Sequence, residues 1–319
     1  MIQAPITDTE LQSHLAAIEP DGMSIFVLAG GQFRGAFFHG THFVNQMRAN
    51  HNLGILETLV LGQACLCAAL LIPTIKGRGR VQFRYDTNGP AAGFSTEADS
   101  SGYVRGYLLQ DPIPVDKPLE SWDLAPFFGP GTLTVTRFAD NARVPQTGTV
   151  EIKHRNIAKD LTWYFLQSEQ IHTAFNTSIK FDRQGRVIGA GGMFLQAMPQ
   201  AGGKNTQFTR YSGDELFDGV EHAFSSAPPF GEWFSEHGNR DDVIYGLFRE
   251  FDVQTVLERD IVFDCPCSAE RYVSAIAHLG RGEVEDILAH DPDPIEVVCH
   301  NCGSVYHIAK DDIRQKLAE

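Results

Sequence analysis

Hydrophobic and polar positions alternate in several short segments of the chain. In Gly77–Tyr85, the apolar residues Val81, Phe83 and Tyr85 alternate with arginine and glutamine, which predicts a half-buried β-strand. Similar apolar runs bounded by turn residues predict further strands at 24–28, 93–96, 103–109, 131–137, 148–154, 177–181 and 187–198. Several strands with few intervening helices favour an antiparallel α+β domain over a doubly wound fold.

A few segments of the chain have the periodicity of a helix instead. A helix is predicted at 9–18, with Thr7 or Asp8 as its cap, and another at 157–170, capped by Asn156. In the second of these helices, Ala158, Leu161, Phe165 and Leu166 are expected to face the core.

The segment Ile55–Ile72 is apolar almost throughout. It contains Glu57 and Gln63, ends at Pro73, and is at the short end for crossing a bilayer, so a buried core helix is the better interpretation. Cys65 and Cys67 lie within it. Residues two apart on a helix do not face each other, so we interpret both as small core side chains.

The pattern divides the chain into three parts. We predict an N-terminal antiparallel-sheet domain with packed helices over 1–200, ending near Pro199, a helical linker over 201–258, and a small C-terminal domain over 259–319. The linker carries eleven acidic and four basic residues, and its expected helices at 214–224 and 241–250 are short. Dense like charge and broken helices indicate marginal local stability, although an ordinary helical connector explains the same pattern.

The C-terminal part contains the clearest chemical motif. Cys265-Pro-Cys267 is followed after thirty-one residues by Cys299-His-Asn-Cys302-Gly303. Thiolates this close together fit a tetrahedral zinc site; the second pair has the usual spacing of a zinc turn, whereas the one-residue gap of the first pair is tighter than usual. Four cysteines would leave no coordination position for water or substrate. We therefore expect one structural or redox zinc per chain, bound by Cys265, Cys267, Cys299 and Cys302, and no enzyme activity at this site.

Histidines offer weaker candidates for metal binding. His39 and His42 have a spacing that places two ligands on one helical face, but no third ligand accompanies them, so a packed or exposed pair is the better interpretation. His300 and His307 lie near the second cysteine pair. Four cysteines already fill a zinc site, so neither histidine is expected to be a ligand.

Composition narrows the range of partners and compartments. The 319 residues include 26 basic and 40 acidic side chains, a formal charge of −14, which argues against general binding to nucleic acid or to anionic membranes. The first ten residues contain no basic start and no apolar run, so a signal peptide is not expected. The cysteines are interpreted as metal ligands or reduced thiols, and thiols stay reduced in the cytoplasm, so a cytoplasmic protein is expected.

The cysteine pattern and two further stretches resemble the heat shock protein 33 family. Cys-x-Cys followed by Cys-x-x-Cys at the end of a chain of this length is one specific feature. Phe165-Leu-Gln-Ser-Glu-Gln170 is similar to the family's segment ending in Ser-Glu-Gln, and Gly189–Pro199 is similar to its Gly-Gly-x-x-x-Gln-x-Met-Pro signature. The pair Cys65 and Cys67 departs from the family pattern, which does not require it.

This resemblance implies a redox-regulated holdase chaperone. In that reading, the reduced zinc-bound protein is inactive, oxidation of the four cysteines to disulfides releases zinc, the linker over 201–258 unfolds, and unfolding client proteins are bound without ATP. It also implies dimerisation on activation.

Two other function classes compete with this reading. One is a zinc-ribbon module for a nucleic-acid or protein partner, but residues 259–319 form no basic stripe. The other is a zinc enzyme, for which neither an open coordination site nor a nucleophile–base pair is evident.

Overall fold

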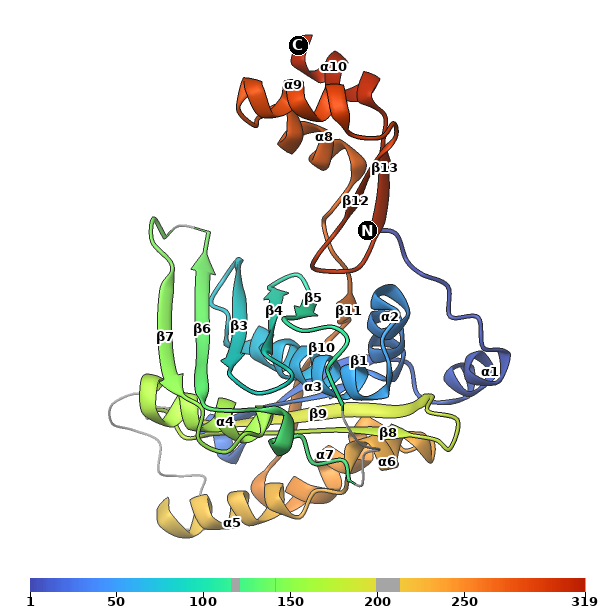
Figure 1. Ribbon diagram of the computed structural model, residues 1–319. Coiled ribbons are helices and arrows are strands. Elements are labelled where there is room, and N and C mark those ends of the chain that lie inside the picture. The colour runs from blue at the N-terminus through green and yellow to red at the C-terminus, as the bar shows by residue number, and fades with distance from the viewer. Residues whose placement is uncertain (116–120, 141, 199–212, 319) are drawn as a thin grey trace.

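The computed structural model of this chain describes residues 1–115, 121–140, 142–198 and 213–318 (Figure 1). Two β-sheets enclose a central helix, a group of short helices covers one sheet, and a small module projects from the other end. The predicted α+β class with a largely antiparallel N-terminal part is confirmed.

Helix α3 (Ile55–Leu71) is the centre of the fold. It packs against strands of both sheets, and its side chains are buried along nearly the whole length. The helix is long and apolar enough to cross a membrane, but 89% of its apolar window is buried inside the protein. Cys65 and Cys67 are fully buried on it, as expected for core side chains. Packing between two sheets therefore accounts for the hydrophobicity of this segment.

The first sheet has five antiparallel strands in the order β10-β1-β2-β9-β8. Their bounds are β1 Gly22–Leu28, β2 Phe33–His39, β8 Thr173–Phe181, β9 Val187–Ala197 and β10 Gln254–Arg259. Strand β10 comes from the predicted linker and pairs with β1, so the expected boundary between 258 and 259 falls within a strand. The expected boundary at Pro199 lies outside the described residues.

The second sheet has six strands in the order β11-β5-β4-β3-β6-β7, of which only the β11–β5 pair is parallel. The bounds are β3 Gly79–Thr87, β4 Gly93–Asp99, β5 Tyr103–Leu108, β6 Gly131–Ala139, β7 Gln146–Glu151 and β11 Val262–Phe263. Val81, Phe83 and Tyr85 of β3 are fully buried, which confirms the alternation seen in the sequence.

The remaining N-terminal helices are α1 (Thr9–Ala17), α2 (Thr41–His51) and α4 (Ile157–Tyr164), with short 3₁₀ turns η1 (Ala29–Gly31), η2 (Ile72–Thr74) and η3 (Ala125–Phe127). The predicted caps Asp8 and Asn156 accept hydrogen bonds from the first turns of α1 and α4. Helix α4 continues as a π-helical segment, η4 (Phe165–Glu169). The wider π turn rotates the following side chains, so Leu166 is 41% exposed and its expected inward orientation is wrong.

The linker helices α5 (Gly213–Ser225), α6 (Phe230–Ser235) and α7 (Arg240–Phe248) lie across the five-stranded sheet, followed by η5 (Arg249–Phe251) (Figure 1). The predicted helices at 214–224 and 241–250 are close to α5 and α7, whereas α6 was not expected. The aromatic rings of Phe230 and Phe234 lie 4.8 and 5.3 Å from that of Phe37 on β2, and Phe248 lies 5.5 Å from Phe26 on β1. The acidic linker is therefore held by an apolar interface.

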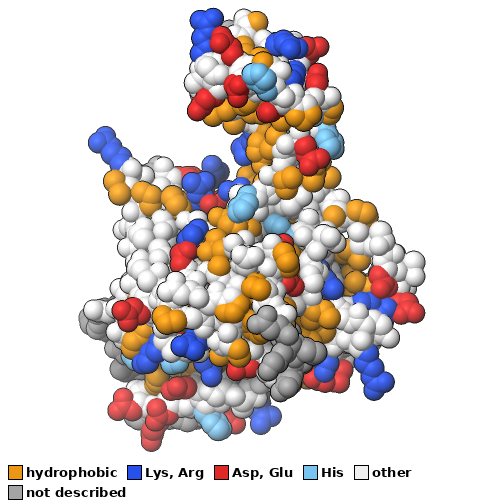
Figure 2. All heavy atoms as spheres, viewed as in Figure 1, with side chains coloured by type: hydrophobic (Ala, Val, Ile, Leu, Met, Phe, Trp, Pro, Cys, Tyr) orange, Lys and Arg blue, Asp and Glu red, His pale blue; other side chains and the backbone are white. Residues whose placement is uncertain are grey.

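The C-terminal module contains α8 (Ala269–Ala277), α9 (Arg281–His290), the hairpin β12 (Ile295–Val298) and β13 (Val305–Ile308), and α10 (Lys310–Ala318). Ser268 caps α8 as predicted. The module has a core of its own, whose buried residues among those described are Val284, Ile295, Ile308 and Ile313. It projects from the body on a narrow neck whose visible face is rich in hydrophobic side chains (Figures 1 and 2).

Candidate metal centre

The first cysteine loop is placed by the short strand β11. Val262 and Phe263 pair in parallel with Tyr103 and Val104 of β5, and the amide of Asp264 donates a hydrogen bond to the carbonyl of Val104 at 3.0 Å. Cys265 follows directly, so the second sheet sets the position of the first loop.

The second cysteine loop is the turn of the β12–β13 hairpin. The amide of Cys299 donates to the carbonyl of Ser304, and the amide of Gly303 donates to the carbonyl of Cys299, each at 2.8 Å. Gly303 has a φ of +69°, in the left-handed region that favours glycine. The tight turn directs Cys299 and Cys302 to the same side.

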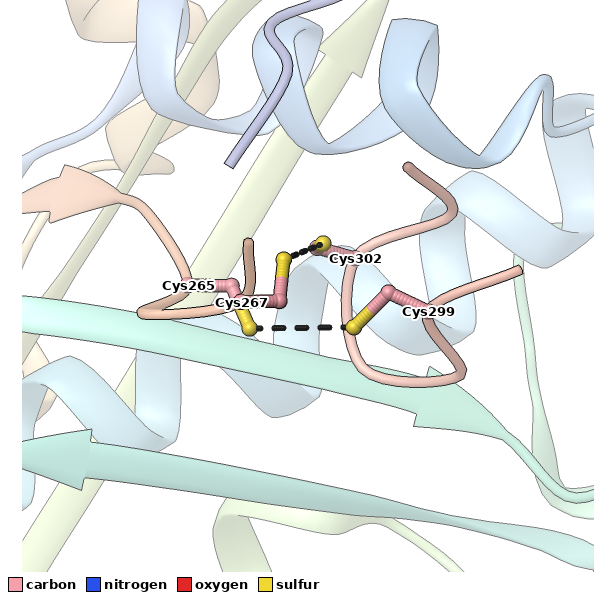
Figure 3. A group of neighbouring side chains, drawn as sticks. All are labelled: Cys265, Cys267, Cys299 and Cys302. Carbon is pink, nitrogen blue, oxygen red and sulfur yellow. Dashed lines mark hydrogen bonds between the residues drawn. The ribbon is translucent and has the colours of Figure 1, made fainter. Parts of the chain in front are cut away.

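The two loops bring four sulfur atoms together (Figure 3). The Sγ atoms of Cys265 and Cys299 are 3.8 Å apart, those of Cys267 and Cys302 are 3.4 Å apart, and all four lie within 4.8 Å of one another. A tetrahedral site with Zn–S bonds of about 2.3 Å requires sulfur separations of roughly 3.8 Å. The soft donor set and its dimensions therefore fit a zinc ion.

Polar neighbours shape the electrostatics of this cluster. The guanidinium of Arg105 donates to Cys265 Sγ at 3.2 Å and is itself paired with Glu97 at 2.7 Å. Hydrogen bonds from Cys265 and Cys302 hold the pKa of Cys299 far below its usual range, whereas hydrogen bonding with Cys265 and Cys299 raises the pKa of Cys302. One thiolate thus forms easily and the next is opposed, so four thiolates together need a bound cation.

Further polar groups around the sulfurs were not anticipated from the sequence. The hydroxyl of Tyr306 lies 3.1 Å from Cys267 Sγ and donates to the carbonyl of Cys267 at 3.0 Å. Ser304 Oγ lies 3.2 Å from Cys302 Sγ. Tyr306 and Ser304 follow the second pair closely, which was an available signal. Arg105 lies far away in the sequence, so no local pattern pointed to it.

The cluster also joins the module to the body. The amide of Gly106 on β5 donates to the carbonyl of Asn301 at 3.1 Å, and Asn50 Nδ2 of α2 donates to the carbonyl of Cys302 at 3.2 Å. A methyl group added at Gly303 would lie 2.3 Å from the carbonyl oxygen of Asn50. Cys265, Cys299 and Cys302 are buried within the main hydrophobic core. The sulfur cluster is therefore part of the docking interface.

The other candidate ligands lie elsewhere in the described structure. His39 is the last residue of β2 and His42 belongs to α2, so they do not share a helical face, because Gly40 separates the two elements. The ring of His300 packs against Tyr107 at 3.9 Å, and His307 is exposed on β13. None of them joins the four-cysteine group, and neither do Cys65 and Cys67.

The glycines of the segment Gly189–Met198 position the linker. A methyl group added at Gly189 would lie 1.9 Å from the carbonyl oxygen of Gly231 on α6, and one at Gly191 would lie 2.5 Å from the ring of Phe234. Glycine at these positions therefore allows α6 of the linker to approach the backbone of β9 closely.

Comparison with known proteins shows which family this chain belongs to. The sequence model described as "Hsp33 protein" matches residues 21–309. The chain belongs to the Hsp33 family. Relatives named 33 kDa chaperonin include one from Synechococcus elongatus, 28% identical over 91% of this chain and 95% of its own length. Another, from Synechococcus sp. strain JA-2-3B'a(2-13), is 30% identical over 94% of this chain and 91% of its own length.

The fold agrees with a solved Hsp33 structure. The crystal structure of the 33 kDa chaperonin from Thermotoga maritima superposes with a TM-score of 0.79 at 26% identity, covering 94% of this chain and 98% of that one. The resemblance that the cysteine pattern and the two motifs suggested is confirmed, and membership of this family supports a chaperone function.

Proposed function

We propose that this chain is a redox-regulated holdase of the Hsp33 family, inactive when reduced and zinc-bound, and active toward unfolding client proteins after oxidation. The observation that carries the proposal is the convergence of four Sγ atoms within 4.8 Å at the neck between module and body. Because the ligand cluster lies at this point, a change in its thiols would alter the docking of the module on the body. The docking of the linker would change with it.

One zinc ion per chain would be held by Cys265, Cys267, Cys299 and Cys302. Bound zinc keeps the sulfurs as thiolates and contributes folding free energy, on the order of 10 kcal/mol or more for structural sites. The module's own core is small, so it depends on this contribution.

Oxidation removes the ligands. Two thiolates and one hydrogen peroxide molecule, with two protons, give one disulfide and two water molecules, so two peroxides convert the four sulfurs of a chain into two disulfides. Hypochlorite acts on the same thiolates as a two-electron oxidant. Disulfides between the members of each pair, Cys265–Cys267 and Cys299–Cys302, would close very short loops and add little entropic stabilisation.

Loss of the cluster is transmitted to the linker through adjacent strands. Cys265 lies two residues after the end of β11, which is only two residues long, and β11 in turn follows β10, the edge strand of the first sheet. Once the cysteine loops leave β5 and α2, β11 would keep only its two-residue pairing with β5, and β10 would be held by β1, the Arg259–Ser100 hydrogen bond and the Arg240–Glu258 ion pair. Release of α5–α7 would then expose the apolar residues of the first sheet, including Phe26, Phe33 and Phe37.

These exposed faces would bind client proteins without ATP. We expect the protein to act in the cytoplasm, where thiols are reduced until oxidative stress occurs, and to dimerise on activation. The high negative charge of the chain would keep client complexes soluble.

The direct test is to count zinc and free thiols in the full chain before and after peroxide. The proposal requires one zinc in the reduced protein, and its loss together with four thiols on oxidation, while Cys65 and Cys67 remain reduced. Zinc retained after the four thiols are oxidised would contradict it. Serine at Cys299 provides the matched variant, and it should lower the zinc content of the reduced protein.

A further inference from the structure

A cavity of about 360 Å³ lies away from the cysteine cluster, between β2, β6 and the π-helical segment η4. Its walls include four cationic side chains, Arg34, Lys76, Arg80 and Arg137, and one carboxylate, Glu169; Arg80 is paired with Glu97 at 3.6 Å. A positive cavity is unexpected in a chain of formal charge −14. Its size lies within the range of small-molecule sites.

Residues from two of the sequence motifs meet at this cavity. Glu169 comes from the Ser-Glu-Gln segment, and Gln196 comes from the signature on β9. Neither contacts the cysteines, so the proposed redox chemistry does not account for them. Glu169 is presented by a π-helical turn, a feature that occurs frequently at functional sites.

Two arginines are held in place with donors to spare. Arg34 Nε and Nη2 donate to Gln196 Oε1 at 3.0 and 2.6 Å, and Arg34 Nη1 donates to the carbonyl of Pro73 at 3.2 Å. Gln196 is itself fixed by a 2.8 Å hydrogen bond from Nε2 to Thr173 Oγ1. A guanidinium has five N–H groups, so one N–H on each Nη atom of Arg34 is left for another acceptor.

Arg137 shows the same arrangement. Its Nε and Nη2 donate to Glu169 Oε1 at 3.3 and 2.7 Å, and its Nη1 donates to Thr74 Oγ1 at 2.9 Å. Among the described residues, Arg34 has no carboxylate within salt-bridge distance. Burial lowers the pKa of Arg34, and the neighbouring positive charge of Arg137 lowers it further. Two half-buried guanidiniums therefore share one carboxylate, which leaves positive charge uncompensated.

We propose that this cavity binds a small organic anion, in which a phosphate or carboxylate group is joined to a compact apolar body. The remaining Nη donors of Arg34 and Arg137 match the fork geometry of such oxyanions, and Lys76 at the rim adds a third positive charge. Phe138, Ile75 and Phe165 provide an apolar wall for the body of the ligand.

Calorimetric titration of the reduced full-length protein tests this assignment, with phenyl phosphate, benzoate and phenol as probes. Phenyl phosphate and benzoate should each bind at one site per chain and compete with each other, and phenol should bind at least tenfold more weakly because it lacks the anion. The tighter of the two anions identifies the preferred oxyanion. Absence of saturable binding by both anions, or equal binding of phenol, would overturn the proposal.

Variants locate the site. Arg34→Gln should weaken anion binding about tenfold or more, and Arg34→Lys should restore part of it by returning the charge without the fork. Since Arg34 is half-buried, Lys76→Gln at the exposed rim gives a second test that leaves the fold intact, with an expected loss of roughly two- to fivefold. Lys159→Gln, an exposed lysine on α4 outside the cavity, is the matched control. Equal effects of the two lysine variants would place the bound anion elsewhere.

Discussion

Removing one aromatic ring from the linker should activate the reduced protein. Phe234 of α6 is fully buried, and its ring stacks on Phe37 at 5.3 Å and on His39 at 3.9 Å. It belongs to the apolar cluster between linker and sheet, whereas the cysteines belong to the other core cluster. Phe234→Ala therefore weakens linker docking and leaves the sulfur site untouched.

The size of this effect follows from burial. Truncation of a fully buried phenylalanine to alanine costs about 3–5 kcal/mol. Since about 1.4 kcal/mol corresponds to a tenfold change in an equilibrium constant, the ratio of detached to docked linker should rise by a factor of roughly 10²–10³ or more. A typical domain has a stability of about 5–15 kcal/mol, so the body remains folded while the population of the detached linker rises by this factor.

Two measurements on the reduced, zinc-loaded variant test this reasoning. Hydrogen exchange should accelerate in 213–259 but stay slow in α3, and the variant should suppress aggregation of a thermally unfolding client without oxidant. Phe128→Ala is the matched control, because Phe128 is equally buried but packs on Tyr85 at 5.0 Å in the other cluster. Faster linker exchange without chaperone activity would show that linker release does not create the client site. Unchanged linker exchange would refute the packing argument.

Three further predictions concern the neck, the ligands and pH. Gly303→Ala should weaken the docking of the module, because the left-handed backbone and the 2.3 Å approach to the Asn50 carbonyl exclude a methyl group. Hydrogen exchange in 295–308 should then be several-fold faster than in the unmodified protein. Cys299→Ser should sharply lower zinc content measured by atomic absorption, whereas Cys65→Ser should leave it unchanged; the reverse result would contradict the ligand assignment. Burial, followed by the charge of Arg240, lowers the pKa of His39 from 6.5 to about 3, so the stability that neutral His39 provides is present above about pH 6.5 and lost as pH falls toward 3. His39→Gln should flatten this part of the thermal unfolding profile, and an unchanged slope would assign the titration to another group.

Local patterns in the sequence were sufficient for much of the fold. The alternation at Val81, Phe83 and Tyr85 predicted β3, because one face of that strand is buried. The apolar run at 55–72 predicted α3, because a helix packed between two sheets must be apolar on all sides. The cysteine spacing predicted the convergence of the four sulfurs, since the members of each pair are held close together, the first on a short loop and the second on a tight hairpin turn.

Features that depend on contacts between distant residues could not be predicted in this way. Strand β10 is largely exposed and has no clear alternation, so its pairing with β1 is specified by the sheet edge rather than by its own sequence. Arg105 lies 160 residues from Cys265, and only the β5–β11 pairing brings them together. Leu166 was misplaced because a π turn interrupts the helical period that the prediction assumed.

The most direct test of the proposed redox switch is light scattering from a thermally unfolding client in the presence of reduced or peroxide-treated protein, without ATP. The account predicts that the reduced protein leaves aggregation unchanged, that the oxidised protein suppresses it, and that prior reduction of the oxidised protein with restored zinc removes the suppression. Equal protection by reduced and oxidised protein would contradict the redox switch, and protection by neither would contradict the holdase function itself.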